Sequence, residues 1–298
     1  MSKLSKRIGL LFIVLASGCA GPDYGGPKRL EALSGDLKKR IAVVDFIDKT
    51  DYGKGRLGIA ASDILEGELQ RSGKFTMVSH SGMDEVLNLQ AVGQSGVYDA
   101  STVVQAGRMV GANAIINGSV SEFGIKKSGF SVPGIVGTKG LLARAVVDIH
   151  LIDGTTGVIL MSETAEGSAE TSATKILNIG GEGTYDETLA GKAMRAAITT
   201  LVQKISAKLS EVPWEGFVLS VEGPGAFITG GEDVGLRPGM RFEIRTAARQ
   251  VTAPNGKTYA LPGQTKGRLR VSDVMADLSQ GQIEQGSAAK DDLVRYVK

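Results

Sequence analysis

The segment 141–161 constrains the fold of this chain more than any other part of its sequence. Apolar residues occupy every second position from 141 to 151, and Arg144, Asp148 and His150 lie on the other face. This alternation is typical of a β-strand with one buried face. The sequence DGTTG at 153–157 then predicts a hairpin turn, and residues 158–161 predict the returning strand. The chain must therefore form an antiparallel hairpin that buries one face against another element.

Strand and helix patterns surround this hairpin and complete one domain. Short apolar runs predict buried strands, and apolar residues at helical spacing predict amphipathic helices. Strands that alternate with helices predict an α/β (α+β) main domain with a mixed sheet and flanking helices over residues 39–212. The expected strands are 40–46, 75–78 and 114–120, and the expected helices are 57–71, 83–90, 101–110 and 187–210.

The last part of the chain, 213–298, has a different pattern. Short β runs are divided by turn sequences such as RPG at 237–239 and PNG at 254–256, and no helical periodicity is visible. These signals predict a small all-β domain, either a barrel or a sandwich.

The N-terminus has the three-part layout of an export signal. Basic residues precede an apolar run at 8–16, and small residues then lead to Cys19, the single cysteine of the chain. We expect residues 1–18 to be a lipoprotein signal peptide and residues 19–38 to be a lipidated tether, with acyl chains on Cys19 that anchor the protein to the membrane. Ala20 stands where similar lipoproteins carry Asp for inner-membrane retention, which implies delivery to the outer membrane. The alternative is an ordinary signal peptide with an incidental cysteine.

Composition excludes several other classes of protein. One Cys cannot make a disulfide framework or a thiolate zinc site, and two distant histidines, His80 and His150, leave little for a histidine metal site. After the apolar run at 8–16, no stretch approaches the length of a membrane-spanning helix. Removal of residues 1–18 takes away three basic residues and changes the formal charge from +2 to −1. The remaining charge gives no reason to expect a nucleic-acid partner.

The sequence offers no catalytic constellation. Gly191 and Lys192 lack the rest of a phosphate-binding loop, because Asp186 and Ala193 occupy positions that need Gly and Ser or Thr. His80 and His150 are explained as ordinary loop or strand residues. We therefore expect a protein that is not an enzyme and that uses no cofactor or metal.

Five segments of the main domain carry a family pattern in their order and spacing, namely 41–50, 64–90, 111–124, 143–160 and 184–198. Together they span nearly all of 39–212 and resemble the curli secretion channel lipoproteins, the family of CsgG and the holdfast anchor HfaB. The residues from 218 to 298 resemble the C-terminal domain of flagellar assembly protein T. That second likeness is concentrated at 231–244 and 267–283.

The channel family implies a homo-oligomeric outer-membrane ring in which each subunit donates two β-hairpins to one transmembrane barrel. Unfolded fibre subunits would pass through this barrel, which must be closed because an open sheet edge leaves backbone groups unpaired in lipid. Two inserts, 122–145 and 162–188, have room for the hairpins. In the second insert, polar residues share one face and small residues the other. The alternative is that both inserts are disordered or periplasmic loops.

The loop after the first strand bears on pore gating. In the channel family, a long loop at this place narrows the pore with aromatic and amide side chains. Here the loop is only 48–56, and Tyr52 is its sole aromatic residue. The resemblance makes Tyr52 a candidate constriction residue, and the alternative is an ordinary exposed turn residue.

Two functional hypotheses follow from the resemblance. The first is an outer-membrane lipoprotein that forms or supports an oligomeric secretion pore for surface fibre or adhesin subunits. The second is a lipid-anchored periplasmic scaffold or regulator of cell-envelope assembly, which would act on peptidoglycan synthases or at the flagellar base. The short loop at 48–56 and the scarcity of aromatic residues in the inserts favour the second hypothesis.

Overall fold

The computed structural model describes residues 37–52, 55–78, 110–129, 139–172, 187–247, 249–252, 258–261 and 263–297. The described residues all belong to one compact unit, Leu37–Lys298. Cys19, His80 and the helices predicted at 83–90 and 101–110 lie outside the described residues. Among the described residues, no helix combines the length and the apolar character that a membrane span requires.

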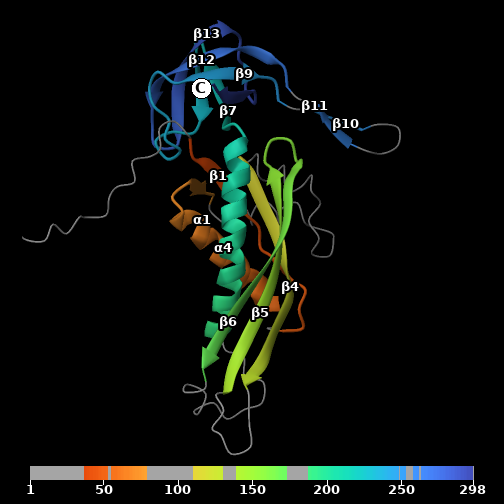
Figure 1. Cartoon of the computed structure of the whole chain (residues 1–298). Helices are drawn as coiled ribbons and strands as arrows, with labels where there is room; N and C mark the ends of the chain where they lie inside the picture. Colours follow the sequence, from red (N-terminus) through yellow and green to blue (C-terminus); the bar gives the residue numbers. More distant parts are fainter. Residues whose placement is uncertain are drawn as a thin grey trace, which may run out of the picture. The chain divides into compact units, whose positions relative to one another are not determined.

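A mixed sheet forms the centre of the main domain (Figure 1). Its strand order is β3-β1-β4-β5-β6, and β2 pairs with β4 outside this path. The pairs β1–β3, β1–β4 and β2–β4 are parallel, whereas β4–β5 and β5–β6 are antiparallel. The strands are β1 (Lys39–Val43), β2 (Ile47–Asp48), β3 (Phe75–Met77), β4 (Ala114–Gly129), β5 (Lys139–Asp153) and β6 (Ile159–Ser172).

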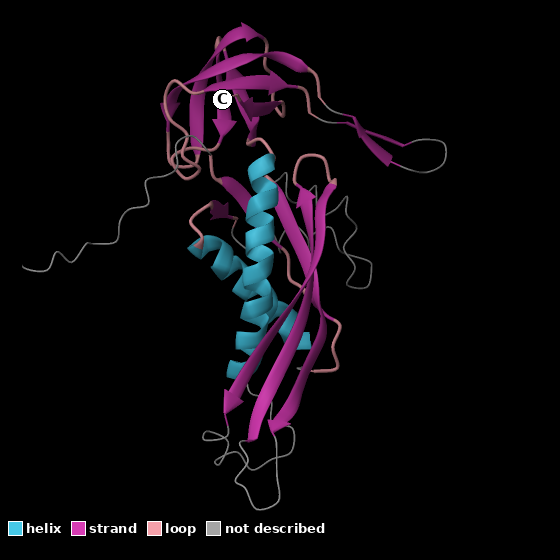
Figure 2. Cartoon of the chain, viewed as in Figure 1, coloured by secondary structure: helices cyan, strands magenta, loops and turns pink. Residues whose placement is uncertain are grey.

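Two helices cover one face of this sheet, α1 (Arg56–Arg71) and α4 (Glu187–Glu211) (Figure 2). The alternating apolar residues of β5 lie on the covered face, as their pattern predicts. They pack with the apolar stripes of both helices into the main core, which includes Leu65, Ile149 and Ile198. The helices predicted at 57–71 and 187–210 are therefore confirmed almost to the residue.

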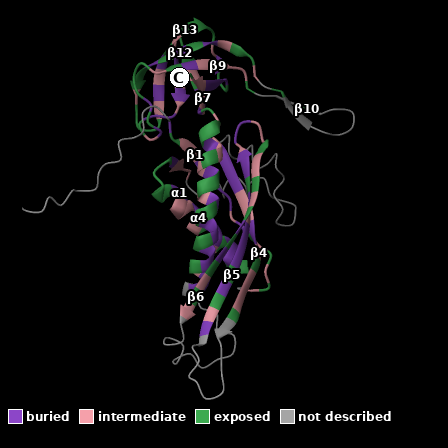
Figure 3. Ribbon diagram, in the orientation of Figure 1, coloured by how far each residue is buried: buried purple, intermediate pink, exposed green. Residues whose placement is uncertain are grey.

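The opposite face of the sheet changes character along its length. At the end where the parallel strands lie, Val44, Ile115 and Ile152 belong to a second, smaller apolar cluster. Further along β4, β5 and β6 the same face carries polar residues, and most of these are exposed (Figure 3).

Strands β4 and β6 are much longer than their sequence pattern indicates. β4 continues nine residues beyond the predicted end at 120, and β6 runs to Ser172 rather than to 161. The added residues are rich in Gly, Ser, Lys and Glu, so they carry a weaker strand signal than β5, although polar and small residues alternate along much of 162–172. Pairing with β5 holds them instead. The β4–β5 pairs run from Ala114↔Asp153 to Gly129↔Lys139, and the β5–β6 pairs extend as far as Gly140↔Ser172.

The C-terminal part is a closed six-stranded barrel with the order β12-β13-β8-β7-β14-β9. The sequence left a barrel and a sandwich open, and the structure forms the barrel. Its core contains Trp214 and Phe242, whose rings meet edge to face at 5.6 Å. The strands are β7 (Glu215–Glu222), β8 (Gly225–Thr229), β9 (Arg241–Arg245), β12 (Thr265–Val274), β13 (Leu278–Gly286) and β14 (Leu293–Tyr296).

Two further features belong to the barrel. Strands β10 (Arg249–Thr252) and β11 (Thr258–Leu261) form a separate two-stranded hairpin between β9 and β12. Leu37 is buried in the barrel core, and the Trp214 indole donates a hydrogen bond from Nε1 to the carbonyl oxygen of Lys38 at 3.1 Å. Leu37 and Lys38, at the end of the segment 19–38 that the sequence presents as a tether, are therefore part of the packed structure.

Candidate functional site

The part of β4, β5 and β6 that continues beyond β2 overlaps both predicted inserts, 122–145 and 162–188. We call it the strand extension, and it comprises 121–129, 139–146 and 165–172. The first insert is a β4–β5 hairpin, as expected, although its turn lies outside the described residues. The second insert contributes one described strand, β6, and α4 begins at Glu187. A second strand in that insert would have to lie within 173–186, which the structure does not describe.

The exposed face of the strand extension carries an ion-pair network. Arg144 on β5 donates to Glu166 on β6 from Nε at 2.5 Å and from Nη2 at 2.9 Å. It also donates from Nη1 to Glu122 on β4 at 2.6 Å, so one guanidinium group bridges three strands. The hydrogen bonds from Arg144 hold the pKa of Glu166 below its ordinary value. All three side chains are about half exposed, so the network is a surface feature screened by water.

Polar contacts continue on the same face toward the apolar end of the sheet. Thr164 donates to Asp148 Oδ1 at 2.6 Å, and His150 Nδ1 lies 2.8 Å from Ser162 Oγ. Burial alone would raise the pKa of Asp148, but hydrogen bonds from Thr164 and Ser121 outweigh it and lower that pKa. A polar face that spans three strands is suited to contact with water or with a polar chain.

The opposite face of the strand extension packs on α4. Ala143, Ala145 and Gly167 are buried there, as the small-residue face of the second insert predicts. A Cβ atom on Gly167 would lie 2.1 Å from the carbonyl oxygen of Ala193 and 2.3 Å from the amide nitrogen of Ala197. Small residues on β6 therefore let the helix backbone approach the strand closely.

Tyr52 lies against the strand extension rather than free in its loop. Its ring meets that of Phe123 on β4 at 5.0 Å and 62°, and the side chain is half-buried. The Asp48 carboxylate shapes this loop, because Oδ1 accepts hydrogen bonds from Thr50 N at 3.0 Å and Thr50 Oγ1 at 2.7 Å. The structure thus places Tyr52 in an intramolecular aromatic pair, and its role at a constriction stays a prediction.

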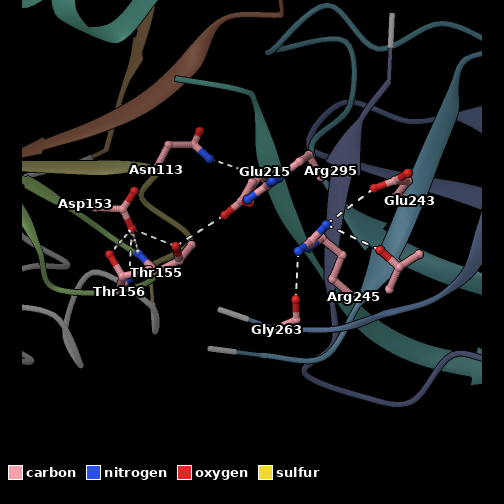
Figure 4. Close-up of polar contacts among 10 residues, drawn as sticks. Asn113, Asp153, Thr155, Thr156, Glu215, Glu243, Arg245, Gly263 and Arg295 are labelled. Carbon is pink, nitrogen blue, oxygen red and sulfur yellow. Dashed lines mark hydrogen bonds and ion pairs between the residues drawn. The ribbon is translucent and has the colours of Figure 1, made fainter. Parts of the chain in front are cut away.

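A polar junction joins the main domain to the barrel, and the sequence did not reveal it (Figure 4). In the β5–β6 turn, Asp153 Oδ1 accepts hydrogen bonds from Thr155 and Thr156. Thr155 Oγ1 donates to Glu215 Oε2 of the barrel at 3.2 Å, and Arg295 binds the other oxygen of Glu215 at 2.6 Å. The only sequence signal at this place is the turn itself, because its barrel partners are 60 or more positions away.

The described residues offer no metal site and no catalytic pocket around the histidine. They contain no group of three or more His, Cys, Asp or Glu side chains that could hold an ion. His150 and Ser162 lie on an open sheet face and line neither of the two described cavities. The expectation of a protein without enzymatic activity stays a prediction.

Comparisons with known proteins agree with the fold. The family model described as "Curli production assembly/transport component CsgG" matches residues 30–217. A Neisseria meningitidis serogroup B protein named "Putative lipoprotein NMB1126/NMB1164" is 31% identical over 183 residues, which cover 57% of this chain and 77% of that protein.

Several solved structures are also similar in part. Lipoprotein GNA1162 from Neisseria meningitidis is 13% identical and has a TM-score of 0.32, with 58% of this chain and 99% of that chain covered. The PelC dodecamer from Paraburkholderia phytofirmans is 14% identical, with a TM-score of 0.28 and coverage of 55% and 88%. The C-terminal domain of LpoB from Escherichia coli is 20% identical, with a TM-score of 0.30 and coverage of 46% and 87%. At these TM-scores the likeness carries no conclusion about this chain.

The family match extends over more than half of the chain and includes the whole main domain with its strand extension. Together with the Neisseria relative, it shows that this chain belongs to the CsgG family of curli production assembly/transport components.

Proposed function

We propose that this protein is an outer-membrane lipoprotein, anchored through acyl chains on Cys19, that forms or supports an oligomeric secretion pore for surface fibre or adhesin subunits. The observation that carries the proposal is the two-faced strand extension, with charged and polar residues on one face and small or apolar residues on the other. The proposal includes no catalytic step, cofactor or nucleic-acid partner.

The two faces correspond to the two sides of a water-filled transmembrane barrel. Arg144, Glu122 and Glu166 cannot face hydrocarbon, so their face would line the lumen. The face with Ala145 and Gly167 would turn toward lipid once it leaves α4. Within the strand extension, β4, β5 and β6 contribute nine, eight and eight described residues, at or just below the 9–11 residues, approximately, that a tilted strand needs to cross a bilayer.

A second function, a lipid-anchored periplasmic scaffold or regulator, is supported by a different observation. The small-residue face is already covered by α4, with backbone contact at Gly167. In this arrangement the small-residue face of the strand extension is covered and its described polar face is exposed, so the strand extension would stay in water. The two functions therefore differ in whether this face leaves α4.

Imaging of the oligomer tests the pore directly. The protein would be extracted from outer membranes in mild detergent and imaged by electron microscopy. We expect symmetric rings with an open centre and a detergent belt. The contrary result is a population of monomers or small oligomers that leave the membrane once the acyl chains are removed. That result would contradict the pore and support the scaffold function.

A pair of neighbouring cysteine variants tests the orientation of the strand extension. Ala169 and Glu170 lie on opposite faces of β6, and Cys19 is the only native cysteine. In a pore, a fluorophore on Ala169→Cys is quenched by nitroxide-labelled lipids, whereas one on the matched Glu170→Cys is quenched by a water-soluble quencher. Absence of lipid quenching at both positions, together with water quenching at Glu170→Cys, would support the scaffold.

A further inference from the structure

The hairpin of β10 and β11, which we call the arm, has no supporting surface of its own. Each of its strands packs extensively only on the other, and Figure 1 draws the pair reaching away from the barrel. An isolated two-stranded hairpin is marginal in water. Val251 and Leu261, which share one face of the ladder, are 43% and 38% exposed. By register, Arg249 and Tyr259 belong to the same face, so this face combines one basic residue with two apolar side chains that are partly exposed.

The base of the arm, in contrast, is firmly held. Arg245 on β9 donates from Nη2 to the carbonyl oxygen of Gly263 at 2.7 Å. Thr246 N donates to Gln264 O at 2.9 Å, and Gln264 N donates back to Thr246 Oγ1 at 2.9 Å. A Cβ on Gly263 would lie 1.7 Å from Thr246 O, so the two strands cross at backbone contact. These contacts fix the residues on either side of the arm to each other.

A groove of the right character lies beside that base. A cavity of about 520 Å³ opens where the barrel meets the main domain, with Phe217, Leu219 and Leu293 on the barrel side and Val110 and Thr155 on the other. Leu219 is 42% exposed, and Val221, next on the same strand, is 37% exposed. Exposed apolar residues that gather around a hollow mark an interaction surface.

We propose that the arm of one copy docks in this groove of a second copy of the chain. Ala247, immediately before the arm, lines the groove, so each chain's own arm starts at the rim and leads away from it. An arm with exposed apolar residues and a groove lined in part by apolar residues, both on one chain, make a head-to-tail contact, which repeats into a ring when its rotation closes. This inference rests on the oligomer in the proposed function and names the surfaces that join its subunits.

Charge is consistent with this pairing. Arg249 is the only charged residue in β10 and β11. Asp291 lines the groove, is exposed, and has a left-handed backbone with φ of 69° that projects it from the end of the loop before β14. Lys290 also lines the groove, and Arg40 there is already bonded to Asp233. Docking must therefore bring Arg249 to the Asp291 side of the rim.

Cross-linking in the full-length protein tests the contact. Val251→Cys and Leu219→Cys chains with different tags would be co-expressed and oxidised in membranes. We expect a mixed disulfide dimer, at least about tenfold more abundant than with Ile59→Cys, because docking raises the local concentration of the two thiols. Ile59 is an apolar position on α1 that is even more exposed than Leu219, at 52% against 42%. One chain with both cysteines should give a ladder beyond dimers, because each copy offers one arm and one groove. Two cross-linking results would overturn the proposal. Val251→Cys could cross-link mainly to Val251→Cys of a second copy, or it could cross-link to Ile59→Cys as much as to Leu219→Cys. Quenching of a fluorophore at position 251 by nitroxide-labelled lipids would also overturn it.

The same samples separate this inference from the proposed function. Rings with a detergent belt but no 251–219 disulfide would support the proposed pore and contradict the docking of the arm in the groove. A 251–219 ladder in oligomers without a detergent belt would support the docking and reject the pore. Charge reversal at the arm alone, Arg249→Glu, should reduce the 251–219 cross-link, and Asp291→Arg in the partner chain should restore it.

Discussion

At the scale of single residues, Gly167 sets how closely α4 approaches the sheet. A side chain at this position would overlap the helix backbone at Ala193 and Ala197. A backbone group cannot move aside as a flexible side chain can, so any added atom must separate the helix from the strand.

We therefore expect Gly167→Ala to lower the free energy of unfolding by about 1–3 kcal/mol, the usual cost of overpacking. Gly124 on β4 is the matched control, because a Cβ there meets nothing within 4 Å. Gly124→Ala should change the free energy of unfolding by less than about 0.5 kcal/mol. Urea denaturation followed by circular dichroism measures both. Equal effects would show that α4 does not rest on the strand at this distance.

Glu68 is the residue that ties the two helices together by charge. Arg195 on α4 and Arg71 on α1 both donate hydrogen bonds to its Oε1. Burial alone would raise the pKa of Glu68, but the hydrogen bonds from the two arginines outweigh it and lower that pKa. A carboxyl group whose pKa is lower in the folded state contributes stability above its unfolded pKa and loses that contribution as the pH falls through the folded pKa.

Glu68→Gln should accordingly destabilise the protein at pH 7 and have progressively less effect in acid, below the ordinary glutamate pKa. Because Arg195 and Arg71 are 49% and 60% exposed, the loss at pH 7 should be only about 0.5–1 kcal/mol. Urea unfolding at several pH values measures this dependence. In a double-mutant cycle, Arg195→Gln should remove most of the effect of Glu68→Gln, and independent effects would contradict the pairing.

At the scale of elements, the sequence predicted the helices and β5 well because each buries one face against a single core. Leu65 in α1 and Ile198 in α4 each belong to a series of apolar residues at helical spacing, and Ile149 in β5 alternates with polar neighbours. The periodicity of the sequence therefore indicates which face of each element is buried. The ends of β4 and β6 were missed because Lys126 and Glu170 carry no such signal and depend on pairing with β5. The junction around Glu215 could not be predicted, because its partners are far apart in the sequence and carry no local pattern that links them.

Helix α1 illustrates a capping interaction that the sequence also conceals. Its N-cap residue is Gly55, which has no side chain to accept a hydrogen bond from the first turn. Asp48 takes this role from the preceding strand, since its Oδ2 accepts a hydrogen bond from Leu57 N at 3.3 Å while Oδ1 holds Thr50. One carboxylate therefore shapes the loop that carries Tyr52 and satisfies the start of the helix.

Asp48→Ala should lower the free energy of unfolding by about 1 kcal/mol, as for the loss of an N-cap side chain. Asp51→Ala in the same loop is the control for loss of charge, because Asp51 is exposed. Amide hydrogen exchange should accelerate at Leu57 in Asp48→Ala but not in Asp51→Ala. Unchanged exchange at Leu57 in both variants would rule out the capping role of Asp48.

At the scale of the whole molecule, the main domain and the barrel are joined by contacts that are partly buried. Arg40 on β1 donates to Asp233 Oδ2 from Nε at 3.0 Å and from Nη2 at 2.7 Å, and Thr76 Oγ1 donates to the Asp233 carbonyl oxygen. The side chains of Arg40 and Asp233 are only 17% and 23% exposed, so this pair is less screened than the surface network around Arg144. Leu37 adds apolar contact, because it is buried in the barrel core directly before β1.

Asp233→Asn should therefore weaken the coupling between the two domains as well as their stability. Loss of a partly buried, charge-assisted contact costs about 1.5–3 kcal/mol, and the variant should melt in two calorimetric steps where the native chain melts in one. Glu232→Gln is the matched control, because it removes the same charge from the neighbouring, exposed position. If both variants melt like the native chain, the apolar contacts of Leu37 and Trp214 hold the junction without the ion pair. In that case, the replacement of Leu37 by Asp, and not of Asp233, should separate the two transitions.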